Sequence, residues 1–269
     1  MKQRIITGAI LVIVLGLFIY FGEGELEFLF SGLCVVLSSL AAFEFSRMLN
    51  KGKKFSVLNY LSIPFTFVFT LLSVFFFQTD FFYMIVFVFI ISILLIYSLI
   101  YVFNDGFMKK DFSEQILTIF YTSLGFIGFA YLRTVSIHLI IYLFIVAMIT
   151  DVFAYFIGIR FGKRRLAPKI SPKKSVEGAI GGLLFGGVIA GLYAYFLGVF
   201  DTNIIFIFLI SFGLSIIAQI GDLVASKFKR EHNIKDYSNL FPGHGGVMDR
   251  FDSSAFASIF LMLLVMVIL

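Results

Sequence analysis

The chain has 269 residues, of which 60% are hydrophobic and only 14% are charged, and its formal net charge is +5. This composition excludes an ordinary soluble globular protein, in which about a quarter of the residues are charged, and is typical of a membrane-embedded protein. The basic residues are scattered between apolar runs instead of forming a basic domain, so we expect no nucleic-acid partner. Anionic lipid and an anionic substrate are the better candidates.

Nine apolar runs follow one another along the chain. A membrane-spanning helix needs roughly 17 to 25 such residues, and lipid leaves no partner for unpaired backbone groups, so each run predicts a helix. The sequence therefore predicts an all-α fold, a polytopic integral membrane helical bundle with about nine transmembrane helices. The runs are residues 5–22, 28–48, 57–77, 82–103, 116–132, 139–161, 178–200, 204–226 and 253–269.

The basic residues lie almost entirely on one side of this predicted bundle. If the helices alternate in direction, all of the 21 Lys and Arg residues except Arg133 lie at the N-terminus or in the segments 47–56, 104–115, 160–177 and 227–252. Positive charge marks the cytoplasmic side of a membrane protein. We therefore expect an inner (cell) membrane protein with a cytoplasmic N-terminus and an active site on the cytoplasmic side.

The two halves of the chain differ in chemistry. Residues 1–135 are rich in Phe and poor in reactive side chains, which predicts an N-terminal transmembrane helical scaffold. Residues 136–269 carry nearly all the chemically capable residues, which predicts a C-terminal catalytic transmembrane region with cytoplasmic loops 160–177 and 227–252.

Two acids lie inside the apolar runs of the second half. Asp151 lies in the sixth run and Asp222 in the eighth, where an ionisable side chain is costly and indicates a functional site. Ser226, Lys229 and Arg230 follow Asp222 at helical spacing, so a hydroxyl and two cations share its face. The alternative is that Asp222 only pairs with an interior Lys or Arg.

Asp249, Arg250 and Asp252 stand just before the ninth run. Helix capping would explain one of these carboxylates, but not both. Together with Asp222 they would suit Mg²⁺, which takes one or two protein carboxylates and leaves room for phosphate oxygens. Whether a second cation also binds stays open. Zinc is disfavoured because the His residues nearby have no close Cys or His partner.

The segment Phe241–Gly246, FPGHGG, lies between these acids. Its glycines would allow the backbone to approach a ligand closely, and its N–H groups could form a nest for an anion. With Lys235 and Arg250 close by in sequence, it predicts a phosphate-holding loop. His244 either donates to a phosphate or is a turn residue with a local hydrogen bond.

Lys173, Lys174 and Ser175 precede the seventh run. The start of a helix favours an anion, so these residues are candidates for holding phosphate. Alternatively, Glu177 completes a local cap with Ser175 or Ser171. Within the run, glycines recur every four residues from Gly178 to Gly186, a pattern that favours close helix packing.

The stretch from Ser226 to Asp252, SKFKREHNIKDYSNLFPGHGGVMDRFD, resembles the signature of the phosphatidate cytidylyltransferases, also called CDP-diacylglycerol synthases. Residues 171–182, SPKKSVEGAIGG, and 151–163, DVFAYFIGIRFGK, are also similar to that family. The N-terminal half resembles it only as a run of spanning helices.

The resemblance implies an integral membrane nucleotidyltransferase that condenses CTP with phosphatidic acid, giving CDP-diacylglycerol and pyrophosphate. It also implies an all-helical homodimer that depends on Mg²⁺. Asp222 and Asp249 would be the metal ligands and Asp252 a further ligand, with His244 donating to a phosphate or the leaving group. The expected substrate-binding residues are Asp151, Lys173, Lys174, Ser226, Lys229, Arg230, Lys235 and Arg250.

Two alternatives remain. A CTP-dependent lipid or polyprenol kinase would also need a membrane bundle, CTP and Mg²⁺, but would release CDP instead of pyrophosphate. An ion-coupled transporter would suit Asp151, Asp222 and a helix kinked or broken at Pro64. Against the transporter, the polar residues gather on one side of the membrane and no inverted repeat is evident.

Overall fold

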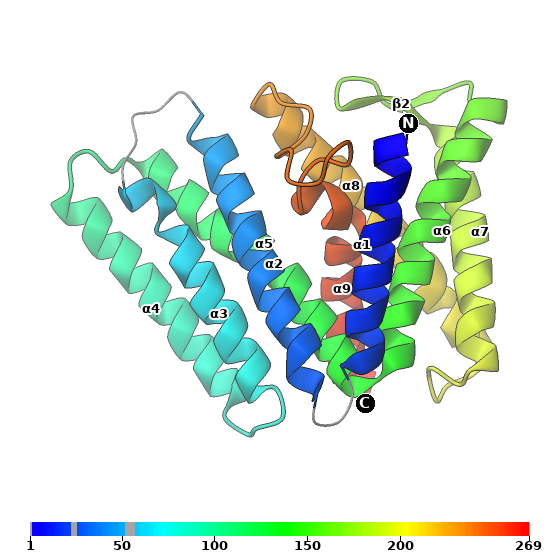
Figure 1. Ribbon diagram of the computed structural model, residues 1–269, viewed down its shortest axis with the longest axis horizontal. Coiled ribbons are helices and arrows are strands. Elements are labelled where there is room, and N and C mark those ends of the chain that lie inside the picture. The colour runs from blue at the N-terminus through cyan, green and yellow to red at the C-terminus, as the bar shows by residue number, and fades with distance from the viewer. Residues whose placement is uncertain (1, 23–25, 52–56, 269) are drawn as a thin grey trace. The chain divides into compact units, whose positions relative to one another are not determined.

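In the computed structural model, the described residues are 2–22, 26–51 and 57–268, and most of them are helical (Figure 1). Within them, eight helices are long and apolar enough to cross a membrane, and Ile6–Phe21 forms a shorter apolar helix. The predicted all-α polytopic bundle is therefore confirmed. The helices are α1 (Lys2–Phe21), α2 (Glu27–Leu49), the short 3₁₀ helix η2 (Val57–Tyr60), α3 (Ser62–Phe76), α4 (Phe82–Phe103), α5 (Lys109–Val135), α6 (Ile137–Phe161), α7 (Val176–Phe196), α8 (Ile204–Glu231) and α9 (Met248–Ile268).

The chain forms two compact units. The first comprises residues up to Tyr131 together with Asp236–Asp249, and the second comprises Leu132–Lys235 together with Arg250–Leu269. The sequence-based division at residue 135 kept the whole loop 227–252 in the second region, whereas here most of that loop belongs with the first unit. Residues 52–56 of the predicted cytoplasmic segment 47–56 lie outside the described part of the chain.

In the first unit, α2 packs against α1 and α3, and α3 packs against α4. The side chain of Gln115 on α5 accepts a hydrogen bond from the Ser62 backbone N–H at 3.0 Å and donates one to the Asn59 carbonyl at 2.8 Å. These bonds satisfy backbone groups where η2 gives way to α3. Pro64 therefore lies in the first turn of α3, where a missing N–H costs nothing, and the break precedes it.

In the second unit, α7 packs closely against both α6 and α8. A Cβ atom added at Gly178 would lie 2.6 Å from the Ala154 carbonyl oxygen, and one at Gly182 would lie 2.6 Å from the Thr150 carbonyl oxygen. One added at Gly186 would overlap with Thr150. The predicted close packing along these glycines is confirmed, because only glycine leaves room for the backbone of α6.

A short β-hairpin precedes α7, and no pattern in the sequence indicated it. Strand β1 (Arg165–Ala167) pairs antiparallel with β2 (Ser171–Ser175). Lys173 and Lys174 therefore lie directly before α7, as their place in the sequence indicated, but on a strand. Ser175 is the N-cap of α7 and accepts from the Gly178 N–H at 3.1 Å.

Glu177 does not complete a cap with Ser175. Its carboxylate accepts hydrogen bonds from the backbone N–H groups of Lys163 at 3.0 Å and Arg164 at 3.2 Å. The side chain thus fastens the start of the hairpin to the first turn of α7. The hairpin is held in place at its base by α7 itself.

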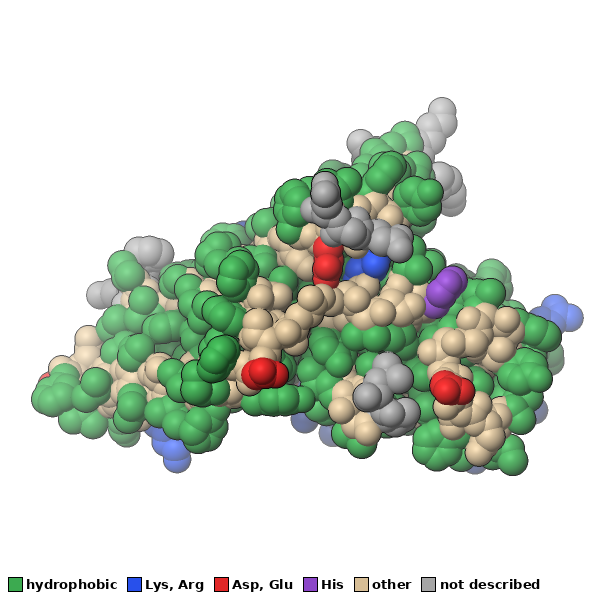
Figure 2. All heavy atoms as spheres, turned by 90° about the horizontal axis from the view of Figure 1, so that it is seen from below, with side chains coloured by type: hydrophobic (Ala, Val, Ile, Leu, Met, Phe, Trp, Pro, Cys, Tyr) green, Lys and Arg blue, Asp and Glu red, His purple; other side chains and the backbone are tan. Residues whose placement is uncertain are grey.

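The outer surface is that of a protein in lipid. Large hydrophobic side chains such as Phe75, Phe103 and Val267 are more than three-quarters exposed. Side chains of this size and number would be unfavourable in water and are expected against hydrocarbon. Figure 2 looks at the ends of the helices from below, where Lys and Arg side chains are few.

The packing of α6 on α7 can be tested with one added methyl group. We expect Gly182→Ala to destabilise the protein by about 1 to 3 kcal/mol, because overpacking forces backbone shifts. Gly213→Ala on α8 is the matched control, since its Cβ would lie 3.9 Å from the nearest atom, on Phe260. Thermal unfolding in detergent compares them, and Gly182→Ala unfolding at or above the wild-type temperature would contradict the packing described.

Candidate active site

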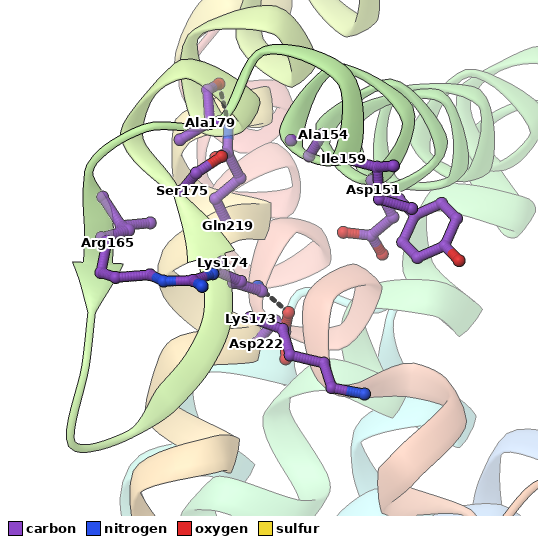
Figure 3. A pocket seen from close by; sticks show the side chains of 14 residues that line it. Asp151, Ala154, Ile159, Arg165, Lys173, Lys174, Ser175, Ala179, Gln219 and Asp222 are labelled. Atoms are coloured by element: carbon purple, nitrogen blue, oxygen red, sulfur yellow. Dashed lines mark hydrogen bonds and ion pairs between the residues drawn. The ribbon is translucent and has the colours of Figure 1, made fainter.

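A cavity of about 680 Å³ opens in the second unit, between α6, the hairpin, the start of α7 and α8 (Figure 3). Acidic side chains reach it from the helices and basic side chains from the hairpin. A cavity with both charges at the edge of an apolar bundle suits a ligand that carries phosphates and a metal ion. It is lined by Asp151, Ala154, Tyr155, Gly158, Ile159, Gly162, Arg165, Leu166, Lys173, Lys174, Ser175, Ala179, Gln219 and Asp222.

The central contact of the cavity is an ion pair between Lys174 of β2 and Asp222 of α8 (Figure 3). The two side chains are 28% and 21% exposed, so the pair is open to a ligand on one side. Ser226, one turn further along α8, donates from its hydroxyl to the other Asp222 oxygen at 3.3 Å. Asp222 thus pairs with a cation, as the simpler reading of the sequence allowed, but that cation is itself a predicted phosphate-binding residue.

Two further carboxylates lie near Asp222. Asp151 on α6 is exposed to the cavity and accepts from the Ser253 hydroxyl at 3.3 Å. Asp252 on α9 pairs with Lys229 of α8 at 3.9 Å. Both acids are close enough to Asp222 for electrostatic repulsion between like charges. Around Asp222, three carboxylates therefore face the two ammonium groups of Lys174 and Lys229, which is a local excess of negative charge, while the exposed Lys173 and Arg165 line the wider cavity.

Close contact between α8 and α9 brings Asp252 into this group. A Cβ added at Gly221 would lie 2.8 Å from the Asp252 carbonyl oxygen and would overlap with Phe256. The glycine next to Asp222 therefore allows α9 to approach. Gln219, one turn before Asp222 on the cavity side, donates to the Ala179 carbonyl at 3.2 Å and ties α8 to α7.

The acids of the second unit fit an open magnesium site and not a closed one. Among the described residues, no three His, Cys, Asp or Glu side chains are grouped tightly enough to enclose a metal ion. Mg²⁺ needs only one or two protein carboxylates, because waters and substrate phosphates complete its shell. Hard oxygen donors with excess negative charge, as at Asp222, Asp151 and Asp252, meet that requirement.

Asp249 belongs to the first unit, where it holds the loop that precedes α9. One carboxylate oxygen accepts from the backbone N–H groups of Tyr237 at 2.7 Å and Gly246 at 3.0 Å, and the residue is buried. Its predicted role as a metal ligand stays a prediction. What the structure adds is a structural role for the same carboxylate.

The FPGHGG loop is a tight turn whose backbone is occupied by its own hydrogen bonds. The N–H groups of His244 and Gly245 both donate to the Phe241 carbonyl, at 2.8 and 3.1 Å, and the Phe241 N–H donates to Gly245 at 2.8 Å. Since the Gly246 N–H is bound by Asp249, these groups do not form the expected anion nest. The interpretation overlooked that a turn this tight uses its donors internally.

His244 lies against α1 within the first unit. A Cβ added at Gly8 would lie 3.2 Å from its Nε2 atom. Its Nδ1 atom is buried and has no hydrogen-bond partner among the described residues. The structure thus leaves one donor or acceptor of this ring available, and the predicted contact with a phosphate or leaving group remains to be tested.

The remaining predicted cations differ in what they do. The guanidinium of Arg230 donates to the carbonyls of Ile170 at 3.3 Å and Ile234 at 2.8 Å, so it braces the hairpin turn against the end of α8. Lys173 is exposed and lines the cavity, whereas Lys235 and Arg250 are exposed on other surfaces. Substrate contacts of all four stay predictions.

Sequence reasoning missed two residues. Arg165 lines the cavity, but in the sequence it belongs to a basic cluster that charge bias across the membrane already explained. Glu44 is buried inside α2 and binds the loop before α9. An acid within an apolar run was the signal that identified Asp222, and the same signal would have found Glu44.

Comparison with known proteins identifies the family of this chain. The chain belongs to the cytidylyltransferase family, whose model matches residues 2–268. It is 34% identical over 265 residues to the phosphatidate cytidylyltransferase of Bacillus subtilis (strain 168), covering 97% of this chain and 96% of that protein. It is 39% identical over 150 residues to the protein of that name from Staphylococcus haemolyticus (strain JCSC1435) and 37% to that from Staphylococcus aureus (strain COL). These two matches cover 56% of this chain and 57% of the staphylococcal proteins.

The charge imbalance around Asp222 predicts an unequal effect of removing either partner of its ion pair. Lys174→Gln leaves Asp222 repelled by Asp151 and Asp252, so we expect it to destabilise the protein by about 1.5 to 3 kcal/mol, the range for losing a hydrogen bond to a charged group. Asp222→Asn removes the repulsion along with the ion pair and should cost less. The double variant should be no less stable than Lys174→Gln alone.

Unfolding in detergent measures all three variants. Lys227→Gln is the control, because its pair with Glu231 is exposed on the same helix, with side chains 62% and 54% exposed, and should matter by less than about 0.5 kcal/mol. If Asp222→Asn proves as destabilising as Lys174→Gln or more so, the excess negative charge described here does not exist.

Proposed function

We propose that this protein is a phosphatidate cytidylyltransferase, which transfers the cytidylyl group of CTP to phosphatidic acid and gives CDP-diacylglycerol and pyrophosphate for phospholipid synthesis. The observation that carries the proposal is the family match along residues 2–268, with a relative of that name aligned over 97% of the chain. A cavity lined by Lys174, Lys173 and Arg165 supports it, because both substrates are phosphate anions.

The reaction needs little general-base chemistry. A phosphate oxygen of phosphatidic acid attacks the α-phosphorus of CTP, a new P–O bond forms, and the bond to the bridging oxygen of the β-phosphate breaks, so pyrophosphate leaves with the electron pair. The barrier arises from bringing two polyanions together and from the charge on the leaving group. Lys173, Lys174 and Arg165 lower it by pairing with phosphate oxygens. Lys174 exchanges its carboxylate partner for a phosphate as substrate enters.

We propose Mg²⁺ as the cofactor, held at Asp222 with Asp151 and Asp252 beside it. When bound, the ion supplies positive charge that offsets the phosphates and the surplus carboxylate. Ser226 orients Asp222 through its hydroxyl, and Lys229 balances Asp252.

The protein is an integral membrane protein, and its bacterial relatives imply that the membrane is the cell membrane. We propose that the hairpin and the N-terminus face the cytoplasm, which the distribution of Lys and Arg supports. CTP is a cytoplasmic metabolite and would reach the cavity from that side. The homodimer that the family resemblance implies stays a prediction.

The alternative activities are separable by product. A lipid kinase would transfer the γ-phosphate of CTP and release CDP, and a transporter would consume no CTP. The purified protein in detergent, given CTP, phosphatidic acid and Mg²⁺, should release one pyrophosphate for each CDP-diacylglycerol formed.

Thin-layer separation of labelled lipid and a coupled pyrophosphate assay measure the two products. Omission of phosphatidic acid or of Mg²⁺ should abolish both signals. Stoichiometric CDP without pyrophosphate would establish the kinase instead, and no nucleotide turnover with both substrates present would exclude the proposed activity.

A further inference from the structure

Glu44 is a buried acid near the C-terminal end of the membrane helix α2, and neither the catalytic cavity nor the family signature includes it. Only 3% of the surface of Glu44 is exposed. The carboxylate accepts three hydrogen bonds, from the Ser238 hydroxyl at 2.6 Å and from the backbone N–H groups of Val247 at 2.9 Å and Met248 at 3.0 Å. All three donors lie in the segment that leads into α9. An acid kept in so apolar a helix requires a function.

The first function of Glu44 is to cap α9. The leading N–H groups of a helix have no partner within it, and a side-chain oxygen just before the helix usually accepts from them. Val247 occupies that place before Met248 and has no oxygen on its side chain. Glu44 accepts from both residues, and its negative charge also meets the positive end of the helix dipole. A side chain from α2 therefore replaces the missing local cap.

Glu44 also explains a glycine of the FPGHGG loop. A Cβ atom added at Gly246 would overlap with the Glu44 carboxylate. At Gly245, whose φ is +85°, it would lie 2.7 Å from the Asp249 carboxylate. Both glycines are thus required by carboxylates of the protein itself, so a ligand is not needed to account for them.

The same segment is anchored at its start. The ring of Tyr237 lies 6.1 Å from that of Phe45, the residue after Glu44, and the Tyr237 N–H is bound by Asp249. Two adjacent residues of α2 therefore hold both ends of the segment, Phe45 by packing and Glu44 by hydrogen bonds. Polar and apolar contacts together hold the loop on α2.

We propose that Glu44 is a positioning residue for cytidylyl transfer, which fixes the segment Tyr237–Met248 and through it His244 and Asp249, without touching either substrate. This inference rests on the proposed function. Loss of one such support displaces the groups it holds, and a displacement of about 1 Å can reduce turnover by roughly 100-fold. Glu44 would thus act on kcat, although it lies on a helix of the predicted scaffold.

The test is Glu44→Gln, which keeps the size of the side chain but removes its charge and places an NH₂ group among N–H donors. We expect kcat for pyrophosphate release, per folded protein, to fall about 10- to 100-fold while KM for CTP changes less than about threefold. Gly246→Ala should have a similar effect by displacing the carboxylate. The double variant should lose no more than the worse single variant, because both changes act on one contact.

Two matched controls lie on the same helix. Glu27→Gln removes an acid from the first turn of α2, and Gly32→Ala adds a methyl group where no atom lies within 4 Å. Both should keep wild-type kcat. Turnover is normalised to the folded fraction from size-exclusion chromatography in detergent, so a loss of stability alone would not reduce it.

Hydrogen exchange gives a second measurement that does not need activity. The backbone amides of Val247 and Met248 should exchange at least about tenfold faster in Glu44→Gln than in wild type, and should be unchanged in Glu27→Gln. Unchanged exchange at these amides would overturn the inference, as would faster exchange with wild-type kcat. If the wild-type protein releases no pyrophosphate, the proposed function fails, and the exchange comparison still decides whether Glu44 holds the segment.

Discussion

The ion pair between Lys174 and Asp222 is the interaction on which the proposed chemistry of this protein depends. A charged side chain within an apolar helix is stable only if a partner compensates it, and the hairpin before α7 supplies that partner. The pair is partly exposed to a cavity, with side chains 28% and 21% exposed, so a ligand can reach it. We propose that phosphate replaces the carboxylate at Lys174 and that a cation replaces the lysine at Asp222. The charges that stabilise the fold would then also bind CTP and a phospholipid headgroup.

Backbone geometry brings these charges to one place. Glycines on α7 allow α6 to pack closely, and Gly221 on α8 allows α9 to pack closely. Acids from three helices therefore lie together around Asp222. Glu177 holds the hairpin that carries Lys174. In the other unit, Glu44 and Asp249 hold the loop before α9 in the same way, because each accepts hydrogen bonds from backbone N–H groups. The carboxylates of this protein therefore fall into two groups. Some bind backbone N–H groups, and others face the cavity.

The sequence allowed the helices and the acids of the second half to be predicted, because apolar length and a charge inside an apolar run are local signals. The sequence did not reveal the β-hairpin that carries Lys173 and Lys174. Its strands have only three and five residues, and nothing in so short a polar segment distinguishes a strand from a loop. The sequence did not show that Asp249 binds backbone N–H groups of the loop, or that the N–H groups of FPGHGG bond within the turn. Such hydrogen bonds depend on the folded path of the backbone. Glu44 carried the right signal but lay in a half of the chain regarded as scaffold.

The central claim is that Asp222 is the carboxylate at which a divalent cation and CTP meet. Its most direct test is the rate of pyrophosphate release as a function of Mg²⁺ concentration in Asp222→Asn, with Lys227→Gln on the same helix as the control. The account predicts that Asp222→Asn loses at least about 100-fold in kcat at any Mg²⁺ concentration, whereas Lys227→Gln follows the wild-type curve. Wild-type turnover with an unchanged Mg²⁺ dependence in Asp222→Asn would contradict it.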